Sequence, residues 1–167
     1  MKIKFYFILF FYFYFLFQPT YLFFSRNDEN LFFNLQKKYS WLNNNLFYFI
    51  NLNSKTYTLP ETFICAVIQR ESHGKIYAHS KKGARGLMQV MECHKPKHSP
   101  AWALYRPILN IALGCRYLDI CRQPDMLEQL RKYNQGHNGR RENYRNWQYV
   151  YDIMFDFAEN ERLYAGL

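Results

Sequence analysis

Apolar side chains recur every three or four residues in several stretches of this chain, a spacing that predicts helices rather than strands. Thr58 and Glu61 have the spacing of a capping box, and a helix is predicted from there to about Ser72. Gly74 suits the turn that follows such a helix. Because strand patterns are weak throughout, we predict a mainly α-helical domain.

A carboxylate lies on the apolar face of this predicted helix. Glu71 is preceded at helical spacing by three apolar residues, namely Ile64, Val67 and Ile68. Burial raises the pKa of a carboxyl group, and the partial negative charge at the end of a helix raises it further. Such a group can donate a proton near neutral pH. Taken alone, however, the spacing fits better with a surface Glu71 paired with Arg70 or Lys75.

Three further helices are predicted in the second half of the chain. Pro107 opens the first, whose core stripe is Ile108, Ile111, Ala112, Cys115 and Leu118. Gly114 inside it suggests the close approach of another backbone. A short helix is predicted at residues 125–133 and a turn-rich loop at residues 135–139. The last helix is predicted at residues 142–158. The apolar face expected for the last helix is Tyr144, Trp147, Tyr151, Met154, Phe155 and Ala158.

The first 24 residues have the pattern of an export signal. Lys2 and Lys4 precede an uncharged apolar run at residues 5–17, and Pro19 lies between this run and a second apolar piece. The run is short for a spanning helix, which needs about 20 residues, and no small-residue cleavage site follows it. An uncleaved signal-anchor is therefore slightly favoured over a removed signal peptide. Both place the rest of the chain in the periplasm or cell envelope, and the anchor would hold it at the inner membrane.

The chain after this segment divides into two predicted parts. Residues 25–57 are expected to be a linker, at residues 25–30, followed by a helical segment that precedes the core. Residues 58–160 are expected to form the catalytic domain.

The formal net charge of +9 is concentrated in the second part. Residues 70–147 carry 15 Lys and Arg against six Asp and Glu. A basic surface favours nucleic acid, anionic lipid or an acidic polymer as partner, although a solvated basic face explains the charge equally well. No helix-turn-helix or zinc-finger pattern occurs, so a nucleic-acid partner is not expected.

The four cysteines form no C-x-x-C pair. Cys65 is expected to be a small buried hydrophobic residue. Cys115 and Cys121 are six residues apart on different faces of one predicted helix, so we do not expect them to pair. The sequence does not decide whether other cysteine pairs form a disulfide, since that depends on export of the domain.

A metal site at Cys93, His94 and His98 was considered. Pro96 breaks any helical geometry between the two histidines, and no further ligand is evident. We therefore expect neither a metal nor a cofactor.

Two short motifs supply recognition chemistry. Residues 83–89 read Gly-Ala-Arg-Gly-Leu-Met-Gln, in which the glycines permit tight backbone packing. Met88 then offers an adaptable apolar contact, and Gln89 offers an amide that both donates and accepts hydrogen bonds. Tyr133 and Asn134 provide an aromatic platform and a second amide at a helix end.

In this order the motifs resemble the lytic transglycosylase (SLT domain) family, the goose-lysozyme-like branch of the lysozyme-like superfamily. The matched segments are Glu71-Ser72, the Gly-Leu-Met-Gln of residues 86–89, Asn110-Ile111 with Gly114 and Tyr117-Leu118, the Tyr-Asn-Gln-Gly of residues 133–136, and Tyr149-Val150. The resemblance covers roughly residues 59–154 and implies a lysozyme-like helical domain with a cleft. Two residues depart from the family pattern. Lys132 stands where the family usually has Ala, and Glu92 stands where it often has Pro.

The resemblance also implies roles for individual residues. Glu71 matches the catalytic acid/base, and Ser72 matches the neighbour that positions it within the substrate site. Within the implied substrate site, Met88 and Gln89 match sugar-contacting residues. Tyr133 and Asn134 match residues that line the opposite side of the cleft, and Tyr149 matches the family's late cleft tyrosine. Tyr144 is an alternative to Tyr149, because Tyr149 lies off the expected apolar stripe.

The implied reaction cleaves the β-1,4 bond between N-acetylmuramic acid and N-acetylglucosamine in peptidoglycan and leaves 1,6-anhydromuramoyl ends. An ordinary glycosidase requires a second acidic residue, and the matched motifs contain none. The alternatives are a hydrolytic muramidase of the same fold and a non-catalytic glycan-binding protein of a secretion or conjugation system. A trans-envelope machine is a further expected partner, by analogy with small dedicated transglycosylases.

Overall fold

The structure is a computed structural model that describes residues 26–136 and 144–165. Its α-helices are α2 (Arg26–Lys38), α3 (Asn44–Tyr57), α4 (Glu61–Ser72), α5 (Pro107–Ile120), α6 (Met126–Gln135) and α7 (Tyr144–Ala165). Two short 3-10 helices, η2 (Glu92–His94) and η3 (Ala101–Tyr105), lie between α4 and α5. No sheet forms among the described residues, where the extended contacts are two isolated bridges that involve Arg85. The prediction of a mainly α-helical domain is confirmed.

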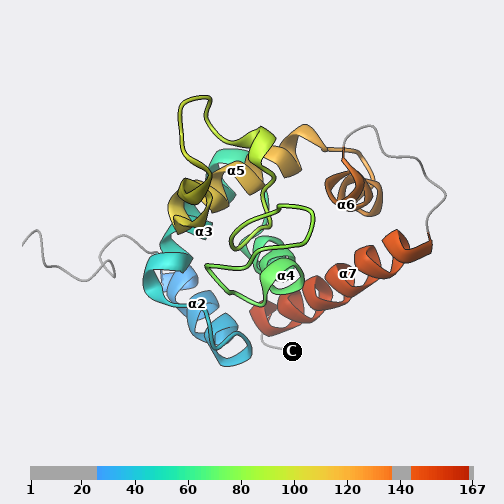
Figure 1. The fold of residues 1–167 in the computed structure, drawn as a ribbon. Coiled ribbons are helices and arrows are strands. Elements are labelled where there is room, and N and C mark those ends of the chain that lie inside the picture. Colours follow the sequence, from blue (N-terminus) through green and yellow to red (C-terminus); the bar gives the residue numbers. More distant parts are fainter. Residues whose placement is uncertain (1–25, 137–143, 166–167) are drawn as a thin grey trace, which may run out of the picture.

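Helix α4 forms the centre of the fold. It packs along α7 and also contacts α3 (Figure 1). Every residue from 62 to 68 is buried, so this helix is enclosed on all faces and not only along the predicted stripe. The last turn of the helix is less enclosed, and Glu71 there is partly exposed.

The ends of α4 are set by Pro60 and His73. The helix begins directly after Pro60, whose carbonyl oxygen accepts from the backbone N–H of Phe63 at 3.1 Å. It ends at Ser72 as predicted, with the left-handed φ of 51° at His73 followed by 71° at Gly74. The predicted capping box is wrong, because Thr58 ends the preceding helix α3 with a φ of 52°.

The segment before α4 holds two helices where one was predicted. Helix α2 begins at Arg26, so the expected linker at residues 25–30 is wrong for residues 26–30. Asn43 separates the two helices by capping α3, since its side chain accepts from the backbone N–H of Leu46 at 3.0 Å. Both helices bury apolar residues in the common core, among them Leu31, Leu35, Phe47 and Ile50. The core runs across residue 58, and the proposed division there remains a prediction.

Helix α5 begins at Pro107, as predicted. Gly114 does lie at a tight contact, but its neighbour is the Met88 side chain and not a backbone, since a Cβ atom there would be 2.5 Å from Sδ of Met88. The predicted stripe is only partly correct. Ile108 is 51% exposed, whereas Asn110 in the same turn is buried, because its side chain bonds to backbone groups of Arg85, Met88 and Leu104.

The last two helices begin close to the predicted positions. Asp125 caps α6 by accepting from the backbone N–H of Leu127 at 3.0 Å. The apolar face predicted for α7 is only partly correct. Trp147 and Met154 pack against the core, whereas Tyr151 is 58% exposed and Phe155 is 75% exposed. The buried face of α7, which packs against α4 and α6, contains Tyr149, Val150 and Ile153.

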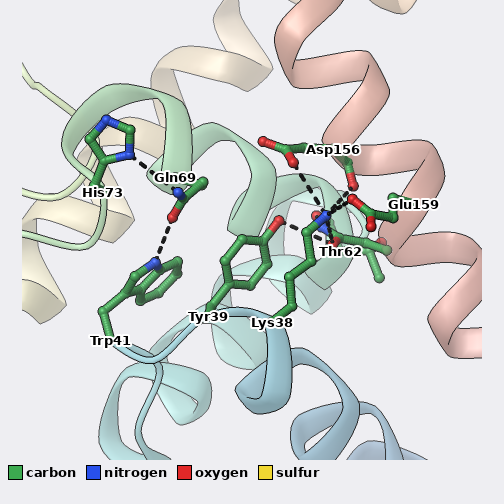
Figure 2. Close-up of polar contacts among 9 residues, drawn as sticks. Lys38, Tyr39, Trp41, Thr62, Gln69, His73, Asp156 and Glu159 are labelled. Carbon is green, nitrogen blue, oxygen red and sulfur yellow. Dashed lines mark hydrogen bonds and ion pairs between the residues drawn. The ribbon is translucent and has the colours of Figure 1, made fainter.

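A polar network ties α7 to α2 and α4 (Figure 2). Lys38 forms ion pairs of 3.2 Å with Asp156 and 2.7 Å with Glu159. The hydroxyl of Tyr39 donates to Oδ1 of Asn160 at 3.0 Å, and Nδ2 of Asn160 donates to the carbonyl oxygen of Thr62 at 2.8 Å. Because Asn160 is fully buried and its amide serves two elements, it anchors the second half of α7.

A second set of contacts holds the turn after α4. Nε1 of Trp41 donates to Oε1 of Gln69 at 2.8 Å, and Nε2 of Gln69 lies 3.2 Å from Nδ1 of His73 (Figure 2). The indole of Trp41 also covers Gly74, where a Cβ atom would collide with the ring. The end of α4 that carries Glu71 is therefore fixed on this side.

All four cysteines are unpaired. Cys65 is buried, as predicted, and Cys115 and Cys121 do not pair. Within the described ranges, no helix combines the length and the apolar character that crossing a bilayer requires. The segment at residues 1–24, for which an export signal is predicted, and part of the predicted loop at residues 135–139 lie outside the described residues.

Candidate active site

Glu71 lines a pocket of about 230 Å³ at the end of α4. The loop that follows α4 supplies one side of this pocket through Ser80, Lys82, Ala84, Gln89, Val90 and Met91. Side chains of η2, α5 and α6 supply the remainder, namely His94, Tyr117, Tyr133 and Asn134. Within this lining set, Glu71 is the acidic residue, so the carboxyl group faces a concave site without a second carboxylate among the described residues.

Burial raises the pKa of the Glu71 carboxyl to about 7, because the charged form loses hydration. The hydrogen bond from Tyr149 and the positive charge of Arg70 both act in the opposite direction. The surface pair between Arg70 and Glu71 that spacing alone favours is not formed, since Arg70 pairs with Asp152 at 3.2 Å. At neutral pH, Glu71 therefore exists in both protonation states and can both donate and accept a proton.

Tyr149 holds one oxygen of this carboxyl group. Its hydroxyl donates to Oε1 of Glu71 at 2.5 Å, and its side chain is buried on α7. Burial and the nearby Glu71 carboxyl raise the pKa of Tyr149 well above its usual value, so the phenol stays a donor. Tyr149 thus contacts the carboxyl group directly, while the structure does not describe the side chain of Tyr144.

Two buried polar side chains hold the Gly-Leu-Met-Gln segment against Glu71. The hydroxyl of Ser72 donates to the carbonyl oxygen of Leu87 at 2.7 Å. Oδ1 of Asn110 accepts from the backbone N–H of Met88 at 2.8 Å. Nδ2 of Asn110 donates to the carbonyl oxygens of Arg85 and Leu104 at 2.8 and 2.7 Å. The sequence included Asn110 in a matched motif but gave no role to it, and this triple contact is that role.

Ser72 and Met88 do not reach the pocket. Ser72 is buried and acts on the backbone of Leu87, which fits positioning rather than contact with a ligand. The side chain of Met88 is fully buried against Gly114, so its predicted contact with a sugar does not fit the structure. Its carbonyl oxygen accepts from the hydroxyl of Tyr133 at 2.8 Å, and Met88 thus joins the loop to α6.

Gln89, Tyr133 and Asn134 line the pocket, where the sequence placed them. Gln89 has a left-handed φ of 49°, and its Nε2 donates to the carbonyl oxygen of Gly86 at 3.0 Å. This bond holds the amide in place. Asn134 is exposed, and Tyr133 is half-buried beside it on α6. The pocket therefore has amide groups on two sides and an aromatic ring.

Sequence reasoning missed several pocket residues, of which Lys82, His94 and Tyr117 carry the most chemistry. Lys82 lies in a turn and His94 in the short 3-10 helix η2, both between motifs, where no periodicity indicates which side chains converge. His94 was weighed only as a metal ligand. Among the described residues, no group of three or more metal-ligating side chains is placed to hold an ion.

Comparisons with known proteins give two findings. A family model described as Transglycosylase SLT domain matches residues 48–151. Among solved structures, the X-ray structure of an inactive Glu-to-Gln mutant of the lytic transglycosylase Slt from Pseudomonas aeruginosa has the same fold, with a TM-score of 0.59 and 22% sequence identity. That match covers 68% of this chain but only 23% of the Slt chain. No curated protein matches the chain.

Proposed function

The chain belongs to the Transglycosylase SLT domain family, and from this premise we propose that it is a peptidoglycan lytic transglycosylase. Its substrate is the β-1,4 bond between N-acetylmuramic acid and N-acetylglucosamine, and its product carries a 1,6-anhydromuramoyl end. The observation that carries this proposal is the Glu71 carboxyl, whose pKa of about 7 and place in the pocket suit a single acid/base.

In the proposed reaction, Glu71 first acts as an acid. It gives its proton to the bridging oxygen as the bond from C1 of the muramoyl residue to that oxygen breaks. The N-acetyl group of the substrate stabilises the oxocarbenium-like centre at C1. The muramoyl 6-hydroxyl then bonds to C1 and returns its proton to the Glu71 carboxylate, so no water is consumed.

The hydrogen bond from Tyr149 supports this cycle. Tyr149 holds Oε1 of Glu71, which leaves Oε2 to carry the proton that is transferred. A pKa near 7 allows the group to release the proton and take one back at similar cost, as a single acid/base must.

The composition of the pocket favours this reaction over hydrolysis. Glycosidases that use water position it, or attack the sugar, with a second carboxylate. Glu71 is the carboxylate that lines the pocket within the described part of the chain. A hydrolytic muramidase would need a second one there.

Digestion of purified sacculi tests the proposal. The wild-type protein is expected to release muropeptides that are lighter by one water than those from a hydrolytic muramidase, which mass spectrometry resolves. Glu71→Gln is expected to keep the fold and to lose turnover by about 10²–10⁴-fold or more. Release of hydrolysed ends, or substantial turnover by Glu71→Gln, would contradict the proposal. Binding to sacculi without any release would indicate the non-catalytic alternative.

Membership of this family implies peptidoglycan binding. The basic surface is consistent with such a partner, since the stem peptides of peptidoglycan carry carboxylates. Lys82 lines the pocket and forms no ion pair with a described residue, so its ammonium group is available to an anionic substrate.

We also propose that the chain acts outside the cytoplasm, held at the inner membrane by residues 1–24. The two lysines and the apolar run of that segment support this location. An assembly that crosses the envelope is a fitting partner for such an enzyme. Fractionation of cells that express the full chain tests the location, and recovery in the soluble cytoplasmic fraction would contradict it.

A further inference from the structure

Three aromatic rings from three separate elements stand in a row along the pocket. The ring of His94 in η2 lies 4.2 Å from the ring of Tyr117 in α5, centroid to centroid, with 38° between the planes. The ring of Tyr117 lies 5.6 Å from that of Tyr133 in α6 at 48°. All three residues line the pocket that Glu71 faces, and we call them the aromatic wall.

Both ends of the aromatic wall are fixed by the surrounding structure. The hydroxyl of Tyr133 donates to the carbonyl oxygen of Met88 at 2.8 Å. At the other end, Glu92 in the same turn as His94 forms an ion pair of 3.3 Å with Arg85. The backbone N–H of His94 also donates to the carbonyl oxygen of Met91 at 3.0 Å. His94 is therefore held over Tyr117 by its own backbone and by its neighbour.

The chemistry of His94 suits contact with a sugar. Partial burial lowers its pKa below the usual value, so the ring is neutral at neutral pH. A neutral imidazole has a flat face together with one hydrogen-bond donor and one acceptor. A pyranose presents C–H groups on its faces and hydroxyls around its edge, which match an aromatic face and polar ring nitrogens.

We infer that His94 is a substrate-contacting residue that packs against an N-acetylated amino sugar next to the bond cleaved at Glu71. The inference rests on the proposed function and adds a contact to it. His94 lies in the segment after Gly-Leu-Met-Gln, where Glu92 already departs from the family pattern. It thus assigns a role to a histidine that the sequence suggested only as a metal ligand.

Binding to a sugar without peptide tests this contact. The probe is a soluble hexamer of β-1,4-linked N-acetylglucosamine, and its Kd is measured by calorimetry with the Glu71→Gln protein, which cannot consume it. His94→Ala and His94→Phe are added to this background. The matched control is His98→Ala, because His98 is exposed on the same loop and does not line the pocket. Thermal unfolding of each variant checks the fold.

His94→Ala is expected to raise the Kd about tenfold, which corresponds to about 1.4 kcal/mol, whereas His94→Phe keeps the flat face and stays close to the parent. His98→Ala is expected to bind as the parent does. The inference is overturned if His94→Ala binds the hexamer as tightly as the parent, or if the parent does not bind it at all. It is also overturned if His98→Ala or His94→Phe loses as much affinity as His94→Ala. The two proposals can fail separately. If hexamer binding depends on His94 but the wild-type protein releases no anhydro ends from sacculi, the proposed function fails while the sugar contact stands.

Discussion

The hydroxyl of Tyr149 donates to Oε1 of Glu71 at 2.5 Å across 78 residues of sequence. Helix α4 brings the carboxyl to the pocket, and α7 brings the phenol to the carboxyl. Burial raises the pKa of Glu71, while the phenol and Arg70 oppose that rise and keep the pKa at about 7. The working range of the acid is thus set by two helices together.

Tyr149→Phe is expected to shift the pH dependence of turnover upward. The hydrogen bond from Tyr149 lowers the pKa of Glu71, so its loss raises that pKa further above 7. Glu71 then stays protonated to higher pH, and the alkaline limb of the pH profile of kcat shifts to higher pH. We expect kcat at the optimum to fall about tenfold because the carboxyl is less well oriented.

The pH profile of kcat for wild type, Tyr149→Phe and Tyr151→Phe checks this prediction. Tyr151 is the control, because it is exposed on the same helix two residues further on. A downward shift of the alkaline limb, or the same shift in Tyr151→Phe, would contradict the account.

Glu71→Gln is expected to stabilise the fold at alkaline pH. Because the pKa of Glu71 rises from 4.5 unfolded to about 7 folded, the folded state holds this proton more tightly. The contribution of this proton to the free energy of unfolding is fully present below pH 4.5 and is lost as the pH rises through 7. Glutamine carries no charge, so the variant should exceed wild type by about 2–3 kcal/mol at pH 8.5 and match it near pH 4.

Urea unfolding of both proteins at the two pH values measures this difference. The comparison removes the contributions of all other titrating groups, since they are common to both proteins. A stability difference that is equal at pH 4 and pH 8.5 would show that Glu71 does not lose hydration on folding.

Gly114→Ala is expected to destabilise the protein, although alanine favours a helix by about 1 kcal/mol over glycine. The new Cβ atom would lie 2.5 Å from Sδ and 2.7 Å from Cβ of Met88. Movement of the thioether alone cannot relieve the second contact, so we expect a net loss of about 1–3 kcal/mol. Denaturant unfolding measures it, with Ala112→Gly on the same helix as a control for propensity. A stabilised Gly114→Ala protein would mean that α5 and the loop can separate without cost.

Asn110→Ala is expected to cost about 2–4 kcal/mol and to reduce turnover. It leaves the backbone N–H of Met88 without its acceptor, and the buried carbonyl oxygen of Leu104 and the part-buried one of Arg85 without their donor. Asn53→Ala is the control, since Asn53 is buried but bonds to Phe49 within its own helix. We expect Asn53→Ala to cost about 1 kcal/mol. Turnover per folded molecule should fall in Asn110→Ala only, and an equal fall in both would contradict the positioning role.

The sequence predicted the parts of this fold whose signals are local. Pro107 as the start of a helix, Ser72 as the end of another and Gly114 as a site of close approach each depend on one residue type at one position. Helical spacing relates Glu71 to apolar neighbours within two turns, but spacing alone favoured a surface carboxylate. Glu71 could be predicted as the acid only because the later motifs follow it in the order of a known family.

The parts that failed depend on tertiary packing. The exposed aromatics Tyr151 and Phe155 were taken for the core of α7, because a chain in which Phe and Tyr are abundant places them outside as well as inside. Met88 was predicted to contact sugar, and only the packing of Gly114 against it shows that it faces inward. His94 and Lys82 come from the long connection between α4 and α5, where the fold alone decides which side chains meet.

The anchoring of α7 by Asn160 has a consequence for the order of events during biosynthesis. Glu71 is translated well before Tyr149, and Tyr149 before the residue that fastens its helix to Thr62 and Tyr39. A nascent chain therefore already bears its acid but not the phenol that tunes it. Its ability to cut glycan should be withheld until α7 has been made and has docked against α4.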